Sequence, residues 1–333
     1  MIEVPKDCIS SLAKYTFIDL FAGIGGFRLA LESFGAKCVF SSEWDKFAQE
    51  VYLSNFHEQP HGDITKIDEC DIPKHDILCG GFPCQAFSIS GKQKGFEDSR
   101  GTLFFDVARI VKYHQPKLVF LENVANFAKH DNGRTLSVVL RTLDELGYNV
   151  TYKVLNAGNY GVPQKRERVY ILGFRKGIES SSFSFPGGNG INVSLKDILM
   201  PNEEVSNFFI TKYTPTWIRD VNVEADLFNM LPNKPIRIGI VNKGGQGDRI
   251  YHTSGHAITL SAYGGGVGAK TGLYMVDGVL RKLAPRECAR LMGLPDTFKI
   301  HPNKNQAYKQ FGNGVVVNVL QHILFSIIER GIL

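Results

Sequence analysis

The sequence predicts an α/β fold, a doubly wound and mostly parallel sheet joined to a smaller domain made mainly of strands and loops. Three observations predict it. Apolar runs typical of buried strands alternate with helical patterns over the first two thirds of the chain. The 333 residues are 43% hydrophobic, which is enough for the core of one large domain or of two ordinary ones. Beyond residue 185 the alternation gives way to a glycine-rich pattern.

The strand–helix alternation can be followed along the chain. A strand at 15–20 leads into a glycine turn and a helix at 25–34. A second strand at 37–41 precedes a helix at 46–55. The elements predicted after these are strands at 75–79, 117–121, 150–155 and 168–174 and helices at 102–113 and 135–146. Strands that alternate with helices favour a parallel sheet with helices on both faces.

The glycine-rich part predicts a second domain. A break at 186–190 (PGGNG) ends the alternation, and ten of the 34 glycines lie between residues 239 and 272. The remaining predicted elements are β-like runs at 236–241 and 257–260 and helices at 285–292 and 315–329. We therefore predict a large domain of residues 1–185 plus 280–333 and a smaller domain of residues 186–279.

Composition excludes several classes of protein. The 38 Lys and Arg against 33 Asp and Glu give +5, which permits a polyanionic partner without requiring one. The first residues include Glu3 and Asp7 and have no apolar core, so no signal peptide is predicted. The apolar segment 315–328 is interrupted by three polar side chains, so no membrane span is predicted. Six cysteines without a CxxC pair predict neither disulfides nor a metal site, as in a reduced, cytoplasmic protein.

The first chemical signal is the turn FAGIGG at 21–26. A glycine turn between a strand and a helix presents backbone amides to a carboxylate or phosphate. A dinucleotide fingerprint would need glycine where Arg28 stands, so NAD is disfavoured. Glu43 and Trp44 close the second strand, where this fold places an acid on a ribose diol. Asp63 follows as a carboxylate that could accept from an exocyclic amine.

The second signal is GGFPCQ at 80–85, directly after a predicted strand. Ligands of doubly wound sheets bind beyond the carboxyl ends of the strands, so Cys84 is predicted to be a nucleophile there. Its loop continues through Ser88 and Ser90 to Gly101 and has the glycines of a closing lid. The other cysteines are predicted to be buried: Cys8, Cys38, Cys70, Cys79 and Cys288.

Two further signals supply charged groups. Glu122 closes the next strand, where a carboxyl beside Cys84 could protonate or grip a ring nitrogen. The motif QKRER at 164–168 leads into a strand, and Arg166 and Arg168 differ by two positions. We therefore predict that both guanidinium groups lie on one face and hold a carbonyl oxygen or an oxyanion.

These motifs occur together with PRECARLMG at 285–293 and QFGN at 310–313. In this order they resemble the motif set of bacterial DNA (cytosine-5) methyltransferases, over nearly the whole chain. The glycine-rich segments at 244–249 and 260–266 resemble the recognition segment of the subgroup that methylates GCGC. Two positions depart from the family pattern, since Gly314 stands where serine is usual and Met292 where glutamine is common.

The resemblance implies S-adenosylmethionine as methyl donor, S-adenosylhomocysteine as product, no metal, and a cytosine flipped out of duplex DNA. The Cys84 thiolate would add to C6 while Glu122 holds N3 and Arg168, with Arg166, holds O2. C5 would then take the methyl group and lose its proton, and elimination would restore the thiol. The positions matched to the cofactor site are Phe21, Gly23, Gly25, Glu43, Trp44, Asp63, Ile64, Pro83, Leu103 and Asn313.

A partner of double-stranded DNA is also favoured by charge, because residues 165–176 and residues 234–274 each contain five bases and one acid. Gln246 is expected to fill the gap left by the flipped base, with Ser90 approaching from the other side, and Arg249 to read a guanine. The positions predicted to contact DNA are Ser88, Ser90, Gln246, Arg249, Thr259, Tyr263 and Gly265.

The expected protein is thus a monomeric enzyme of the bacterial cytoplasm, nucleoid-associated in use, in a restriction–modification system whose endonuclease acts separately. Three alternatives stay open. A tRNA cytosine-5 methyltransferase would share the chemistry but would not need a large glycine-rich duplex reader. A dehydrogenase would leave the Cys84 loop unexplained. A non-enzymatic DNA-binding protein on the same fold would not need Cys84, Glu122 and Arg168.

Overall fold

The structure is a computed structural model that describes residues 3–83, 103–188, 193–219, 221 and 234–333. The chain forms two compact units, here called the large unit and the small unit. The large unit contains Glu3–Leu155, Glu167–Pro186 and Leu320–Leu333, and the small unit contains Asn156–Arg166 and Gly187–Val319. These bounds differ from the sequence-based division, because residues 156–166 and 280–319 belong to the small unit. The assignment of functions to two domains remains a prediction.

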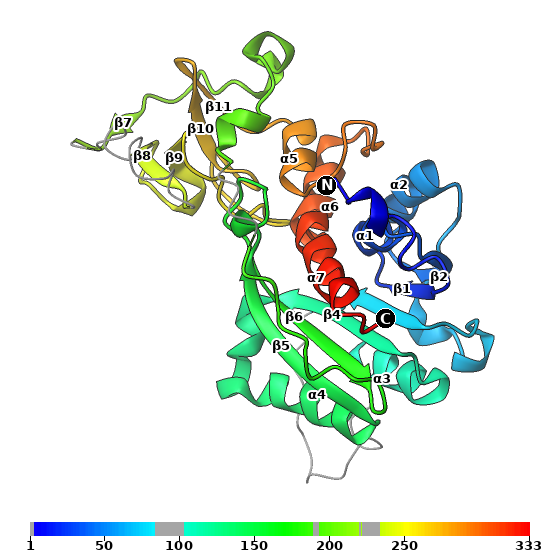
Figure 1. Cartoon of the computed structure of the whole chain (residues 1–333). Helices are drawn as coiled ribbons and strands as arrows, with labels where there is room; N and C mark the ends of the chain where they lie inside the picture. The colour runs from blue at the N-terminus through cyan, green and yellow to red at the C-terminus, as the bar shows by residue number, and fades with distance from the viewer. Residues whose placement is uncertain (1–2, 84–102, 189–192, 220, 222–233) are drawn as a thin grey trace. The chain divides into compact units, whose positions relative to one another are not determined.

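The large unit is built on a six-stranded sheet with the order β2-β1-β3-β4-β6-β5 (Figure 1). Its strands are β1 (Thr16–Leu20), β2 (Lys37–Ser42), β3 (Ile77–Gly81), β4 (Leu118–Val124), β5 (Tyr148–Asn156) and β6 (Glu167–Arg175). Strands β1 to β4 pair in parallel, and β6 pairs antiparallel with β4. The predicted mostly parallel α/β sheet is confirmed. Strand β3 begins and ends later than predicted, so it extends through the glycines of GGFPCQ.

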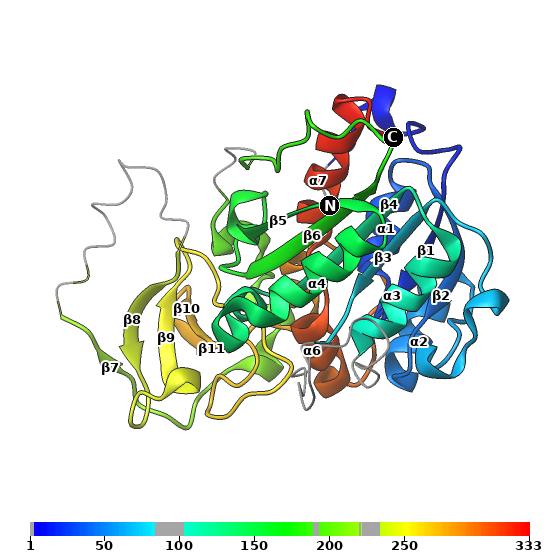
Figure 2. The ribbon, with the colours of Figure 1, turned by 90° about the horizontal axis from the view of Figure 1, so that it is seen from below.

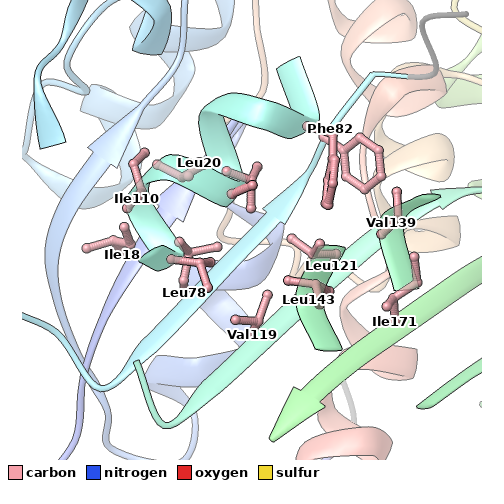
Figure 3. Packing of buried hydrophobic residues seen from close by; sticks show 14 of the residues in the cluster. Ile18, Leu20, Leu78, Phe82, Ile110, Val119, Leu121, Val139, Leu143 and Ile171 are labelled. Atoms are coloured by element: carbon pink, nitrogen blue, oxygen red, sulfur yellow. The ribbon is translucent and has the colours of Figure 1, made fainter. Parts of the chain in front are cut away.

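Helices cover both faces of this sheet. On one face lie α3 (Leu103–His114) and α4 (Arg134–Glu145), whose apolar stripes pack on side chains such as Leu78 and Val119 (Figures 2 and 3). On the other face is α1 (Gly26–Glu32), where the ring of Phe27 meets Phe120 edge-on with centroids 5.1 Å apart. The next helix, α2 (Lys46–Phe56), begins at Asp45, whose carboxylate accepts from two backbone N–H groups as an N-cap.

The small unit has a five-stranded sheet in the order β11-β10-β9-β8-β7. Its strands are β7 (Thr216–Trp217), β8 (Ile236–Ile240), β9 (Arg249–His252), β10 (Leu273–Val276) and β11 (Val279–Arg281), and its helices are α5 (Pro285–Leu291) and α6 (Lys304–Asn313). The predicted strand at 257–260 is wrong. Only Ala257 forms a bridge, to Gln164, because the backbone groups that follow bond to side chains instead of to a neighbouring strand. Helix α6 was not predicted.

The C-terminal part of the chain ends in α7 (Val317–Glu329). Among the described residues, the stretch Lys304–Glu329 is long and apolar enough to cross a membrane by length and composition alone. Its most apolar window is 61% buried inside the protein, which is the pattern of a core helix.

Candidate functional site

The carboxyl ends of β3 and β4 lie together in the large unit. Gly81 is paired with Glu122 in the sheet register. The Asn123 side chain donates to the carbonyl oxygen of Phe82 over 2.8 Å, and both groups are buried. The chain leading to Pro83 is therefore fixed against the ENV motif. Cys84, Ser88 and Ser90, which follow, lie outside the described residues.

Glu122 and Arg168, which the sequence assigns to the same ring, form an ion pair. Nε of Arg168 lies 3.1 Å from Oε1 of Glu122, and the two side chains are only 13% and 7% exposed. The antiparallel register of β4 and β6, with Val124 opposite Arg168, places them on neighbouring strands. A guanidinium and a carboxylate so held can together engage a ring that offers a nitrogen and a carbonyl oxygen.

Arg166 is used differently. Its side chain is almost fully buried and donates to the carbonyl oxygens of Leu260, Gly312 and Gly314 over 3.1, 2.8 and 2.6 Å. The prediction that Arg166 and Arg168 hold one carbonyl oxygen from one face is wrong. Strand β6 begins only at Glu167, so the two-residue alternation of a strand does not extend to position 166.

The glycine turn after β1 is held by Glu43 from the end of β2. Gly23 and Gly25 have φ of 55° and 89°, the left-handed region that glycine adopts freely. The Glu43 carboxylate accepts from the N–H groups of Gly23 and Asp45, each over 2.8 Å. Burial raises the pKa of Glu43, and these two bonds oppose the rise. A side chain at Gly23 would meet no atom within 4 Å, so the space over the turn is open.

Arg28, which breaks the dinucleotide fingerprint, has a structural role. Its guanidinium forms ion pairs with Glu32 and Glu58 at 2.7 and 2.9 Å and lies over the ring of Phe56. A side chain at Gly25 would overlap the same ring. The backbone of the turn thus packs directly against α2, which explains why glycine is needed there.

Asp19, in β1 just before the turn, was not singled out from the sequence. It is fully buried beside the thiol of Cys79, and this burial raises the pKa of Asp19 to about 8.

The prediction that five cysteines are buried is wrong for two of them, because Cys70 is exposed and Cys8 is half-buried. Both lie in short 3-10 turns outside the sheet, whereas Cys38, Cys79 and Cys288 are buried as predicted.

The other predicted cofactor residues of the large unit differ in accessibility. Trp44 is 78% exposed and Pro83 is exposed, whereas the Ile64 side chain is buried in the core. Asp63 caps the turn that follows it, accepting from the backbone and hydroxyl of Thr65 with Oδ1. The remaining predicted residues are Phe21 and Leu103, both half-buried, and Asn313, which ends α6 in the small unit.

Two glycine-rich turns of the small unit contact each other. Gly268 donates to the carbonyl of Gly247 over 2.6 Å, and Val267 donates to the Asp248 carboxylate over 3.1 Å. A side chain at Gly247 would overlap the carbonyl of Gly265. The turn that carries Gln246 is therefore fixed against the turn that carries Gly265.

Five of the positions predicted to contact DNA lie in the described part of the small unit, and all five are at least partly accessible. Gln246, Thr259, Gly265 and Tyr263 are exposed, Tyr263 to 75%, and Arg249 is half-buried at the start of β9. The Thr259 hydroxyl donates to the carbonyl of Lys165. Within the described ranges, no group of three or more His, Cys, Asp or Glu side chains could hold a metal ion.

The two departures from the family pattern are neighbours. A side chain at Gly314 would come 3.4 Å from the terminal methyl of Met292 and 3.1 Å from the carbonyl of Gln310. The Met292 methyl would thus be in ordinary van der Waals contact with a side chain at position 314, and the carbonyl of Gln310 is the tighter contact.

Comparisons with known proteins agree with one another. A model of the family C-5 cytosine-specific DNA methylase matches residues 15–329. The chain is 60% identical over 327 residues to the type II methyltransferase M.HhaI of Haemophilus parahaemolyticus, covering 98% of this chain and 97% of that protein. It is 45% identical to the type II methyltransferase M.HpaII of Haemophilus parainfluenzae, covering 95% and 90%. The S. pombe Dnmt2 methyltransferase crystal structure matches with a TM-score of 0.70 at 20% identity, covering 95% of this chain and 99% of that one.

Proposed function

The chain belongs to the family of C-5 cytosine-specific DNA methylases and is a DNA (cytosine-5) methyltransferase, and we propose that Cys84, Glu122 and Arg168 carry its reaction. The observation that carries this proposal is the buried pair of Glu122 and Arg168. It lies at the end of β4, against the segment of β3 that leads to Cys84.

The reaction requires a nucleophile on a ring that resists methylation. The Cys84 thiolate adds to C6 of cytosine, which makes C5 enamine-like and splits one difficult step into two easier ones. Glu122 holds N3 and stabilises the charge that develops on the ring, and Arg168 donates to O2. After methylation a base such as water takes the proton from C5, the electron pair of that bond restores the C5–C6 double bond, and the C6–sulfur bond breaks to release the Cys84 thiolate. Arg166 takes no part at the ring.

The turn after β1 fits S-adenosylmethionine, which supplies an electrophilic methyl group when bound. The Glu43 carboxylate accepts from backbone N–H groups, those of Gly23 and Asp45 among them, and a carboxylate has about four acceptor positions, so it can also accept from a ribose hydroxyl. The exposed Trp44 ring suits a flat base. Oδ2 of Asp63 lies 4.0 Å from Nζ of the exposed Lys66, and at this distance it can still accept from an exocyclic amine. The open space over Gly23 leaves room beside them. Phe21, Gly25, Pro83 and Leu103 complete the set in the large unit, and Ile64 contributes main chain. Asn313, at the end of α6, is assigned to the cofactor from the sequence alone.

The target base must leave the duplex to be methylated, at a cost of a few kcal/mol. The exposed turns of Gln246 and Gly265 are suited to a DNA groove, because their glycine backbones allow close approach. We assign Gln246 to the gap in the base stack and the exposed Lys234, Arg237 and Lys243 to phosphate contacts. Ser88 and Ser90 are assigned to the other side of the gap from the sequence alone.

Replacing Gln246 by alanine is expected to weaken the base-flipped complex, since nothing then occupies the vacated stack. The turn itself should keep its shape because backbone contacts and Asp248 hold it. A mismatch or abasic position at the target removes part of the unpairing cost. In gel-shift titrations such a duplex should therefore rescue the variant more than the wild type, and equal rescue of both proteins would remove Gln246 from this role.

We propose GCGC as the recognition sequence, with the inner cytosine modified, because the segments at 244–249 and 260–266 resemble the recognition segment of that subgroup. Arg249→Ala should then cost about 1–3 kcal/mol at the cognate site and relax discrimination at one guanine. The matched control Lys234→Ala removes an exposed charge and should weaken binding to all sequences alike. Competition binding with singly substituted duplexes measures the affinity and the base discrimination of both variants. An equal loss of affinity of Arg249→Ala for all sequences would exclude Arg249 from base recognition.

Bisulfite sequencing of DNA from an expressing host tests the proposed function. Methylation at GCGC and nowhere else is expected. Methylation at GGCC, CCGG or every CG would overturn the specificity and leave the enzyme class intact. We further propose that the protein acts as a monomer in the cytoplasm and belongs to a restriction–modification system with a separate endonuclease. The type II methyltransferases among its relatives support this setting.

A further inference from the structure

Residues 163–166 form a short segment of the small unit, here called the hub. Its main chain and side chains make hydrogen bonds to the backbone of other segments of the same unit. Its main chain pairs with the stretch that begins at Ala257: Ala257 donates to Pro163 over 2.7 Å, and Lys165 donates to Ala257 over 2.9 Å. The Gln164 amide, fully buried, accepts from Leu260 N–H over 3.1 Å and donates to the carbonyl of Leu291 over 2.9 Å. The hub therefore fixes the backbone that carries Thr259 and Tyr263.

Arg166 extends the hub to a second segment. One end of its guanidinium, Nη1, donates to the carbonyl of Leu260. The other end, Nη2, donates to the carbonyls of Gly312 and Gly314, which flank Asn313 in the sequence. A planar guanidinium has two amino groups in a fixed fork, so one side chain sets the spacing between the two backbones. Hydrogen bonds from a charged donor are also stronger than neutral ones.

Residues 259–263 and residues 312–314 also contact each other directly, independently of the Arg166 side chain. A side chain at Gly312 would overlap the backbone of Ser261 and Ala262, so the two backbones lie in contact. The stretch assigned to DNA and the turn assigned to the cofactor are thus joined by one buried side chain and one glycine contact. Interiors packed this closely do not deform gradually, so a shift of one segment is passed to the other.

We infer that Arg166 is a positioning residue that couples cofactor binding to DNA binding. Because of Arg166, residues 259–263 and residues 312–314 become ordered together. The ligand that binds first therefore loses the conformational entropy of both segments, and the second ligand binds more tightly. The coupling is reciprocal, since each ligand must raise the affinity for the other by the same factor. This inference rests on the proposed assignments of Asn313 to the cofactor and of Thr259 and Tyr263 to DNA.

The test measures the coupling factor, by which each ligand raises the affinity for the other, in the wild type and in Arg166→Lys. Lysine keeps the charge and loses the fork, so it cannot hold both backbones at the same spacing. Duplex affinity is measured with and without S-adenosylhomocysteine, and S-adenosylhomocysteine affinity with and without a GCGC duplex. In wild type each ligand should raise the affinity for the other about tenfold, and in the variant at most about twofold. Glu167→Gln, an exposed neighbour, is the control and should keep the wild-type factor.

The outcomes separate the inference from the proposed function. A purely structural role would lower the folded fraction or both affinities and leave the coupling factor unchanged, which would overturn the inference. Wild type that binds both ligands without coupling would also overturn it and leave the proposed function standing. Wild type that binds neither ligand would overturn the proposed function itself.

Hydrogen exchange on the wild type decides the question if Arg166→Lys does not fold. S-adenosylhomocysteine alone should slow exchange at Leu260 and Ala262, and the duplex alone should slow exchange at Gly314, whose N–H bonds to Gln310. Protection confined to the segment that each ligand touches would overturn the inference.

Discussion

Replacing Cys84 by serine is expected to abolish methyl transfer while duplex binding stays close to that of the wild type. The hydroxyl is nearly isosteric with the thiol but is far less ionised at neutral pH and is a weaker nucleophile toward C6. Transfer of a tritiated methyl group to a GCGC duplex measures the first effect, and gel-shift titration measures the second. The variant should retain less than about 1% of the wild-type rate, since the covalent route would be lost.

The chain offers a matched control in Cys70, an exposed free cysteine in the 3-10 turn Glu69–Asp71. Cys70→Ser makes the same chemical change away from the proposed site and should keep full activity. A Cys84→Ser variant that methylates at more than a few per cent of the wild-type rate would contradict the covalent mechanism. Equal losses in both variants would indicate a general effect of removing a thiol.

The sheet could be predicted from the sequence because its strands are short apolar runs bounded by glycine and polar residues. Burial on both faces produces such runs, as at Leu78 and Cys79 in β3 and at Val119 and Phe120 in β4. The candidate site was predictable for a related reason. The carboxyl ends of neighbouring parallel strands meet at one edge, which brings Glu122 beside the segment before Cys84.

The contacts of Arg166 could not be predicted from the sequence. The alternation that relates it to Arg168 holds only inside a strand, and the start of β6 cannot be located to one residue from a propensity pattern. Its partners are also remote in sequence: Leu260, Gly312 and Gly314. The same is true of Arg28, which only tertiary packing places over Phe56, and of Asn123, whose bond to Phe82 spans two strands.

The 257–260 segment was predicted as a strand because it is apolar, and burial alone can produce that pattern. Its backbone bonds instead to single groups: Ala257 to Pro163, Ile258 to the Tyr274 hydroxyl, and Leu260 to Gln164. These partners satisfy the buried backbone as well as a neighbouring strand would. Periodicity cannot distinguish the two cases, because both bury the same side chains.

Replacing Glu122 by glutamine is expected to lower kcat at least about 100-fold, the usual scale of an acid–base group, with little change in duplex affinity. The amide keeps the shape of the side chain but is neutral, so it can neither balance the charge of Arg168 nor share a proton with N3 of the ring. Rates are measured per folded protein, because removing one partner of a buried pair is destabilising. Asp296→Asn is the control, since it breaks the exposed pair with Arg290 and should cost less than about 1 kcal/mol without affecting the rate.

Arg168→Leu and the double variant show whether the two residues act on the ring as a unit. If Glu122 holds N3 and Arg168 holds O2 of the same base, each needs the other to keep the ring in place. Losses from residues that act as a unit are strongly non-additive. The double variant should then be no more than about tenfold slower than the slower single variant, rather than slower by the product of both losses. Additive losses, with normal folding of all three proteins, would mean that the pair acts as two independent contacts and that its ion pair serves stability alone.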